Sequence, residues 1–451
     1  MAESEACPKT HADLIVDPLG DGRYALLHPG EPRWAVANAT GLEIARACDG
    51  TRSVAQIADE LSRVYGIPAS QLEADVDLFV GQLAACGLLS SHPLPPAPPP
   101  PRRRSRSLTI YITEQCNLRC SHCAIVEGSM PSTKLTASDV ERMIDEHMRA
   151  FPEEGTVSFL GGEPFMHPDC LRLLEYAARK SRGTSIATNG LLITEEIAGR
   201  LAALTTEVQV SLDGATPEVH EAIRGKGTWS RAWRGLELMA AAGVGRRLSV
   251  AATLTRGIMG QVDALVERCA ALGIGKLRFL QLNKTLAART NWDDIAPDNG
   301  ELLEVTEHLL FDIAPRSWNG MRVVASFPGF VPEAKPGAGH WCPLGETAIV
   351  DSQGVVYTCP SLETSAVTIG NVLEEPLDRI QMGDRAAAAR AAMLERRFAV
   401  AECRACAWRN FCQGGCTAFM AHRSGSSLIN DEFCDFRRHL YRRWVKTKAD
   451  A

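Results

Sequence analysis

The sequence predicts a three-part α/β protein, with a partial (β/α)6 TIM-type barrel between a winged-helix-like α+β unit and a cysteine-rich region. Three observations lead to this fold class. After residue 107, strand-like and helix-like segments alternate six times. A proline-rich segment precedes them, and cysteines become dense from Cys342 onward. We expect a small N-terminal unit over 1–90, a linker over 91–107, a barrel over 108–318 and a cysteine-rich domain over 319–451.

Composition and charge indicate a cytoplasmic globular protein. The chain has 451 residues, of which 45% are hydrophobic and 23% charged, and its net charge of −6 disfavours nucleic acid as a partner. Its first residues lack the pattern of a signal peptide, and we expect no membrane span. Fifteen cysteines in such a chain favour metal or redox chemistry over a disulfide framework.

The small N-terminal unit begins with strand-like segments over 14–18, 24–30 and 33–40. Helical periodicity follows over 53–66 and 68–89, as in a winged helix. We expect Cys48 and Cys86 to be packing residues. The two predicted apolar helix faces comprise Val54, Ile57, Ala58, Leu61 and Val64, and then Leu72, Val76, Phe79 and Leu83.

The segment over 91–107 contains seven prolines and favours an extended, semi-rigid form. Its basic end, residues 102–106, is either a solvated linker end or a contact for an acidic partner.

The predicted barrel strands are residues 108–113, 157–162, 185–190, 208–214, 248–255 and 276–283. Amphipathic segments lie between them, and Cys170 and Cys269 fall on apolar helix faces, where we expect core positions. Because parallel strands present their carboxyl ends at one face, we expect the active site there.

Three cysteines, Cys116, Cys120 and Cys123, follow the first of these strands with C-x3-C-x2-C spacing. A structural zinc site requires four ligands. Each of the four irons in a cubic iron–sulfur cluster needs one terminal ligand, so three cysteines leave one iron open to a molecule other than protein.

The residues "CNLRCSHC" after the first strand resemble the radical S-adenosylmethionine (SAM) superfamily. Four further motifs of that family occur in order near later strand ends: "GGEP" at 161–164, "ATNG" at 187–190, "SLDG" at 211–214 and "IRG" at 223–225. His122 departs from the aromatic or apolar residue usual in the family. Each motif alone could be a simple turn, but their order favours the family.

The resemblance implies a SAM site at these motifs. Gly161, Gly162 and Glu163 would contact the methionyl amine, and Arg224 the carboxylate. Ser211 and Asp213 would contact the ribose, while the backbone of His122 would face adenine. Thr188 and Asn189 complete the expected cofactor contacts. Reductive cleavage of SAM would supply a 5′-deoxyadenosyl radical that abstracts a hydrogen atom from the substrate.

Seven later cysteines resemble the SPASM extension of radical SAM enzymes, which holds two auxiliary clusters. The family pattern implies an outer set of Cys403, Cys406, Cys412 and Cys434, and an inner set of Cys342, Cys359 and Cys416. A full pair of cubes needs eight thiolates, so the inner cluster has one noncysteine or open position. His340 and Asp351 are alternatives for that ligand. We therefore expect three 4Fe-4S clusters and SAM.

Residues 38–89 resemble the PqqD-like peptide-recognition domain, in which a leader peptide adds a strand to the small sheet. This resemblance implies a maturase of a ribosomally synthesised precursor peptide, installing a thioether or carbon–carbon crosslink. Its other partner would be a low-potential electron donor such as flavodoxin or ferredoxin. Two alternatives remain: radical chemistry on a small molecule, tetrapyrrole or protein side chain, and a noncatalytic iron–sulfur sensor that binds DNA.

Overall fold

The computed structural model describes residues 7–91, 107–123, 134–327, 329–330, 347–359, 368–417 and 433–450. Within this part of the chain, no helix is long and apolar enough to cross a membrane.

The N-terminal unit contains three antiparallel strands in the order β1-β2-β3, as the sequence predicts, followed by three helices, one more than the two helical segments predicted. Its strands are β1 Ile15–Pro18, β2 Tyr24–Leu27 and β3 Trp34–Ala37, and its helices are α1 Ala39–Ala47, α2 Val54–Tyr65 and α3 Ala69–Ala85. Leu26, Ile57 and Leu83 are fully buried in its core. The prediction for Val64 is wrong: it is 72% exposed, in the last turn of α2 before Gly66 redirects the chain with φ of 67°.

A ten-stranded sheet, in the order β10-β9-β8-β7-β6-β5-β4-β11-β12-β13, forms the inner layer of the main body. The six predicted barrel strands are present and parallel. They are β4 Ser107–Thr113, β5 Thr156–Gly161, β6 Gly183–Thr188, β7 Glu207–Ser211, β8 Leu248–Leu254 and β9 Lys276–Gln281.

Residues beyond 318 extend this sheet at both of its edges. The strand β10 Arg322–Ser326 pairs in parallel with β9, and β11 Ala348–Val350 pairs in parallel with β4. Two antiparallel strands, β12 Val355–Tyr357 and β13 Thr368–Asn371, complete that edge. The barrel sheet therefore continues into the segment assigned from sequence to the cysteine-rich domain.

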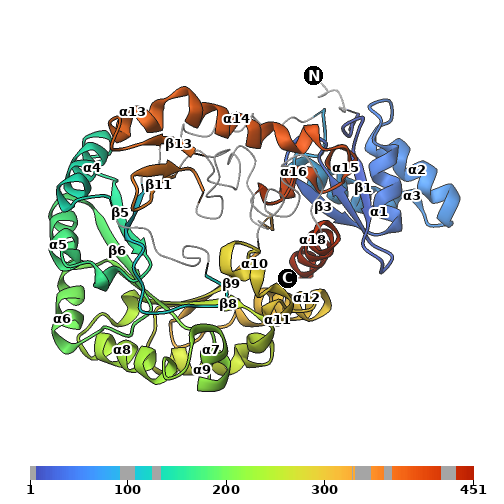
Figure 1. Ribbon diagram of the computed structural model, residues 1–451. Helices are drawn as coiled ribbons and strands as arrows, with labels where there is room; N and C mark the ends of the chain where they lie inside the picture. Colours follow the sequence, from blue (N-terminus) through green and yellow to red (C-terminus); the bar gives the residue numbers. More distant parts are fainter. Residues whose placement is uncertain are drawn as a thin grey trace.

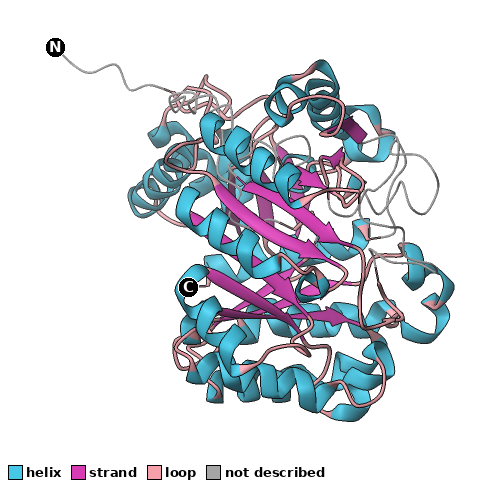
Figure 2. Cartoon of the chain, turned by 60° about the vertical axis from the view of Figure 1, so that its left-hand side comes forward, coloured by secondary structure: helices cyan, strands magenta, loops and turns pink. Residues whose placement is uncertain are grey.

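Helices cover the outer face of the sheet (Figures 1 and 2). The Thr136 side chain and Asp139 form a capping box at the start of α4. The barrel helices are α4 Ala137–Ala150, α5 Cys170–Lys180, α6 Glu195–Leu204, α7 Pro217–Arg224, α8 Trp229–Ala241 and α9 Val262–Ala271. Short helical turns are η1 Pro164–Met166, η2 Gly245–Arg247, η3 Arg256–Gln261 and η4 His308–Ile313.

The main core lies between the sheet and these helices. Ile110, Phe159 and Val210 from the strands are fully buried in it. Cys170 and Cys269 are also buried there, which confirms their predicted packing role. Burial of each large apolar side chain contributes about 1.5–3 kcal/mol, so this core fixes the strand ends that carry the site.

The C-terminal helices pack against the N-terminal unit. Trp34 of β3 and Trp444 of α18 contact each other edge to face, with ring centroids 5.1 Å apart. Figure 1 shows α15, α16 and α18 beside β1–β3. The remaining helices are α10 Leu286–Thr290, α11 Trp292–Ile295, α12 Asn299–Glu307, α13 Leu377–Met382, α14 Asp384–Ala399, α15 Ala401–Ala405, α16 Arg409–Cys412 and α18 Cys434–Ala449.

Candidate active site

The three-cysteine loop follows β4 at the carboxyl edge of the parallel strands. The Leu118 amide lies 3.4 Å from Cys116 Sγ as a hydrogen-bond donor, and the Cys123 amide donates to the Cys120 carbonyl at 3.2 Å. The Ser121 amide donates to the Ile223 carbonyl at 3.0 Å, which ties the loop to the end of α7.

The next strand end lies against this loop at two glycines. Gly161 has φ of 141°, and a Cβ there would lie 2.1 Å from the Thr113 carbonyl oxygen. A Cβ on Gly162 would lie 2.3 Å from the Gln115 carbonyl oxygen. Both positions therefore require glycine for the close approach of two backbones. The amide of Glu163 donates to the Gln115 carbonyl at 2.8 Å, one residue before Cys116.

Glu163 is a fully buried carboxylate held by the third strand end. It accepts hydrogen bonds from the Thr188 hydroxyl and the Asn189 amide, both at 2.7 Å. Burial raises the pKa of Glu163, although these bonds oppose the rise. The Asn189 side chain also donates to Asn117 Oδ1 at 2.7 Å. Thr188 and Asn189 thus connect the "GGE" turn to the cysteine loop.

Asp213 and Arg224 form the electrostatic centre of the site. Arg224 Nε donates to Asp213 Oδ2 at 2.6 Å, and Arg224 Nη1 lies 3.8 Å from Cys120 Sγ. His122 Nε2 is 3.0 Å from the same Asp213 oxygen, and the Thr253 amide donates to the other oxygen at 2.7 Å. Burial opposes ionisation of Asp213, but Arg224 and His122 hold its pKa well below the usual range.

This arrangement gives Asp213 a role that the motif alone does not reveal. Both of its oxygens are engaged by protein groups, so Asp213 holds the Arg224 guanidinium in place beside Cys120. A ribose contact for Asp213 stays a prediction. Ser211 lies half-buried at the end of β7, two residues earlier, and stays a candidate for that contact.

His220 was missed in the sequence. Its Nδ1 accepts a hydrogen bond from the Asp213 amide at 3.1 Å, and the residue is fully buried. Burial lowers the pKa of His220 to about 4, so the ring is neutral near pH 7. No sequence signal singled it out, because a histidine on α7 is as consistent with an ordinary core position.

Burial disfavours the thiolate form of two cysteines in this loop. Burial raises the pKa of Cys116, and it raises that of Cys120 to about 11. Metal binding releases the thiol protons, because thiolates are the ligands. Among the described residues, no three His, Cys, Asp or Glu side chains form a single-ion site. Soft thiolates with Arg224 beside them fit the donor set of an anionic iron–sulfur cluster.

Four C-terminal cysteines, the predicted outer set, line one shared cavity together with Trp408 and Tyr441. They are Cys403, Cys406, Cys412 and Cys434. Three come from the α15–α16 region and the fourth begins α18. Arg437 Nη2 lies 3.6 Å from Cys434 Sγ, and burial raises the pKa of Cys406. No disulfide joins the cysteines of the described residues.

The predicted inner set is only partly described. Cys342 and His340 lie outside the described residues. Cys359 follows β12, and Cys416 follows Gly415, which has φ of 76°. Asp351 is a weak candidate for the missing ligand. It accepts hydrogen bonds from the Val355 amide and the Tyr357 hydroxyl within the β11–β12 turn.

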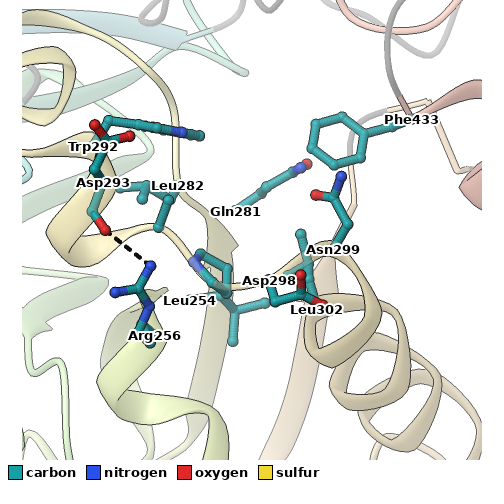
Figure 3. A pocket seen from close by; sticks show the side chains of 12 residues that line it. Leu254, Arg256, Gln281, Leu282, Trp292, Asp293, Asp298, Asn299, Leu302 and Phe433 are labelled. Carbon is teal, nitrogen blue, oxygen red and sulfur yellow. Dashed lines mark hydrogen bonds between the residues drawn. The ribbon is translucent and has the colours of Figure 1, made fainter.

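A cavity of about 400 Å³ opens at the carboxyl ends of β8 and β9. Its walls include Leu282, Trp292 and Phe433, which are apolar or aromatic. The Gln281 side chain points into it toward Phe433 and Asn299 (Figure 3). Gln281 is only 9% exposed, and its Nε2 has no hydrogen-bond partner among the described residues. A buried unpaired donor is costly, so this amide is suited to a ligand acceptor.

Three family models match the chain in the order predicted. Residues 23–89 match coenzyme PQQ synthesis protein D (PqqD), residues 110–268 match the radical SAM superfamily, and residues 342–407 match the SPASM iron–sulfur cluster-binding domain. The mycofactocin maturase MftC of Mycobacterium ulcerans is 32% identical over 324 residues, 69% of this chain and 82% of MftC. The chain belongs to the radical SAM family.

Two further proteins are similar to this radical SAM protein over most of its chain. An AdoMet-dependent heme synthase of Nitratidesulfovibrio vulgaris is 26% identical over 378 residues, 77% of this chain and 98% of the relative. The solved structure of Streptococcus suis SuiB with S-adenosylmethionine covers 94% of this chain and 99% of SuiB. Its TM-score is 0.60 at 17% sequence identity, so this likeness concerns the fold.

Proposed function

We propose that this radical SAM protein modifies a ribosomally synthesised precursor peptide by installing a thioether or carbon–carbon crosslink. The observation that carries the radical chemistry is the position of Arg224, held by buried Asp213 and 3.8 Å from Cys120 Sγ. It offers a fixed cation for the SAM carboxylate beside the expected cluster. The PqqD match and the likeness to MftC support a peptide substrate.

When bound, SAM and its reduced cluster supply the 5′-deoxyadenosyl radical that removes a hydrogen atom from the peptide. Cys116, Cys120 and Cys123 would hold that cluster. Arg224 would orient the carboxylate of SAM, and the "GGE" backbone would lie on its amine side. The Gln281 cavity, next to the strand ends, would hold the reacting peptide residue through its aromatic walls and one donor.

Crosslink formation oxidises the peptide by two electrons. One electron would leave with the abstracted hydrogen atom, and an auxiliary cluster held by the C-terminal cysteines would accept the other. For a thioether, the new C–S bond replaces the C–H and S–H bonds, and the thiol proton goes to a base. The outer cluster would use Cys403, Cys406, Cys412 and Cys434, and the inner cluster Cys342, Cys359 and Cys416. Together with the SAM cluster, these two auxiliary clusters would make three 4Fe-4S clusters.

The direct test uses reconstituted protein, SAM, dithionite and the short peptides encoded beside the gene. We expect 5′-deoxyadenosine together with a peptide that has lost two hydrogen atoms. A tetrapyrrole substrate is the second candidate, because the heme synthase relative is covered over 98% of its length. Conversion of a porphyrin with no effect on any peptide would replace the first proposal with the second.

A further inference from the structure

The carboxylate of Asp17 connects the N-terminal unit to the four-cysteine cavity. Asp17 lies on β1 and is only 8% exposed. The Trp408 indole Nε1 donates to it at 2.8 Å. Arg442 donates from Nε at 2.7 Å and from Nη2 at 2.8 Å. All three donated hydrogen bonds come from the C-terminal region.

Both donors belong to segments that carry cysteines of the cavity. Trp408 lies between Cys406 and Cys412, is 1% exposed and lines the cavity itself. Its backbone amide donates a hydrogen bond to the Cys406 thiol. Arg442 lies on α18, which begins at Cys434. Asp17 therefore bridges the two segments from outside the cysteine-rich region.

We propose that Asp17 is a positioning residue of the outer cluster, contributed by the peptide-recognition unit. The inference rests on the proposed function, because it requires a cluster on the four cysteines. Asp17 has two effects there. It holds the indole of Trp408, the residue whose backbone N–H donates a hydrogen bond to the Cys406 sulfur. It also places a negative charge near that sulfur.

Hydrogen bonds to ligand sulfurs and nearby net charge both set the potential of an iron–sulfur cluster. Arg442 offsets part of the Asp17 charge through its bidentate contact. A cluster at this site would be harder to reduce with the carboxylate of Asp17 nearby than with a neutral asparagine in its place.

This connection changes how the N-terminal unit should be tested. Removal of the whole unit would also remove Asp17 and expose Trp408 and Trp444, which pack on it. Loss of turnover after such a deletion would not distinguish peptide recognition from cluster support. Point variants at the interface separate the two.

The test compares Asp17→Asn with Asp21→Asn in a full-length chain whose Cys116, Cys120 and Cys123 are replaced by alanine. Asp21 pairs with Arg23 and Lys446 at the same interface and does not contact Trp408. Its side chain is 35% exposed. The auxiliary clusters are titrated anaerobically and followed by electron paramagnetic resonance. The outer signal is the one lost in a Cys406→Ala variant.

We expect Asp17→Asn to shift the outer-cluster midpoint to a less negative potential, because asparagine keeps an acceptor but loses the charge. The Asp21→Asn protein should match the parent. If Asp17→Asn fails to load iron, Trp408→Phe keeps the carboxylate and ring stacking but removes the indole donor. Its potential should become more negative, as the Trp408 amide loses its anchor.

If the outer-cluster midpoint potential is unchanged in both Asp17→Asn and Trp408→Phe, with full iron content, the inference is overturned but the proposed function is not. A parent protein that binds no auxiliary cluster would overturn both the inference and the cluster assignment of the proposed function. Iron content and far-UV circular dichroism, measured on each variant, distinguish these results.

Discussion

The guanidinium of Arg224 and the carboxylate of Asp213 form a buried ion pair, with Nε 2.6 Å from Oδ2. Asp213 is fully buried and Arg224 is nearly so, with 11% of its side chain exposed. Buried charges persist where each has a partner and the remaining hydrogen bonds are made. Here the Thr253 amide and His122 also contact the carboxylate oxygens of Asp213. The Nη1 atom of the guanidinium lies toward Cys120.

We predict that Asp213→Asn weakens SAM binding roughly 10- to 100-fold, because the cation that should meet the SAM carboxylate loses its support. The dissociation constant of SAM, measured by equilibrium dialysis on the reconstituted protein, checks this. Asp263→Asn is a matched control, since Asp263 is exposed and pairs with His308 on the outer surface. Equal SAM affinity in both variants would contradict the role of Asp213.

We predict that His220 makes stability rise with pH on the acidic side. Its pKa falls from 6.5 to about 4 on folding, so the unfolded chain binds more protons between these values. Stability therefore increases from about pH 4 to pH 6.5 and levels off above, by on the order of 3 kcal/mol. His220→Asn keeps an acceptor for the Asp213 amide but cannot titrate. Chemical denaturation at pH 5 and pH 7 should show a smaller difference for the variant; an unchanged difference would exclude His220 as its source.

Gly162→Ala should displace the "GGE" turn, because its Cβ would lie 2.3 Å from the Gln115 carbonyl oxygen. We expect a lower melting temperature and loss of SAM binding. Gly199→Ala on α6 is the control, since no atom lies within 4 Å of its Cβ position. Because glycine inside a helix is less stable than alanine, this replacement should stabilise the protein by about 0.5–1 kcal/mol. A Gly162→Ala protein that melts and binds SAM like the parent would argue against this backbone contact.

Gln281→Leu should stabilise the protein while lowering peptide modification. Removal of an unpaired buried amide relieves about 1–3 kcal/mol, and the same change deprives the substrate of a donor. Gln209→Leu is the opposite case, because Gln209 Oε1 accepts a hydrogen bond from Arg278 at 3.1 Å, so stability should fall. Differential scanning calorimetry and peptide mass analysis measure both effects. A Gln281→Leu protein with full peptide turnover would remove this cavity from the substrate site.

Much of the fold follows from local pattern. The six barrel strands were predictable because apolar runs end at turn residues, and Cys170 and Cys269 because they fall on apolar helix faces. Val64 was misassigned, since helical periodicity does not reveal where a helix loses its packing partner. The strands β10 and β11 were missed because five and three residues carry little periodicity, and their pairing depends on the sheet edges.

The site was predictable to the extent that it consists of contiguous motifs. Cysteine spacing indicated which thiols belong together, and the structure places the four of the outer set around one cavity. The hydrogen bond that Trp408 donates to Asp17 and the contact between His122 and Asp213 join residues far apart in sequence. Such pairs depend on tertiary packing, so neither spacing nor composition contains them.

The most direct test of the account is an anaerobic comparison of the parent with Cys120→Ala. The parent should bind about twelve irons, as three cubes require, and should form 5′-deoxyadenosine from SAM under reduction. Cys120→Ala should lose about four irons and all SAM cleavage while keeping the auxiliary clusters. Zinc in place of iron, or full 5′-deoxyadenosine formation without Cys120, would contradict the central claim that this loop carries the SAM cluster.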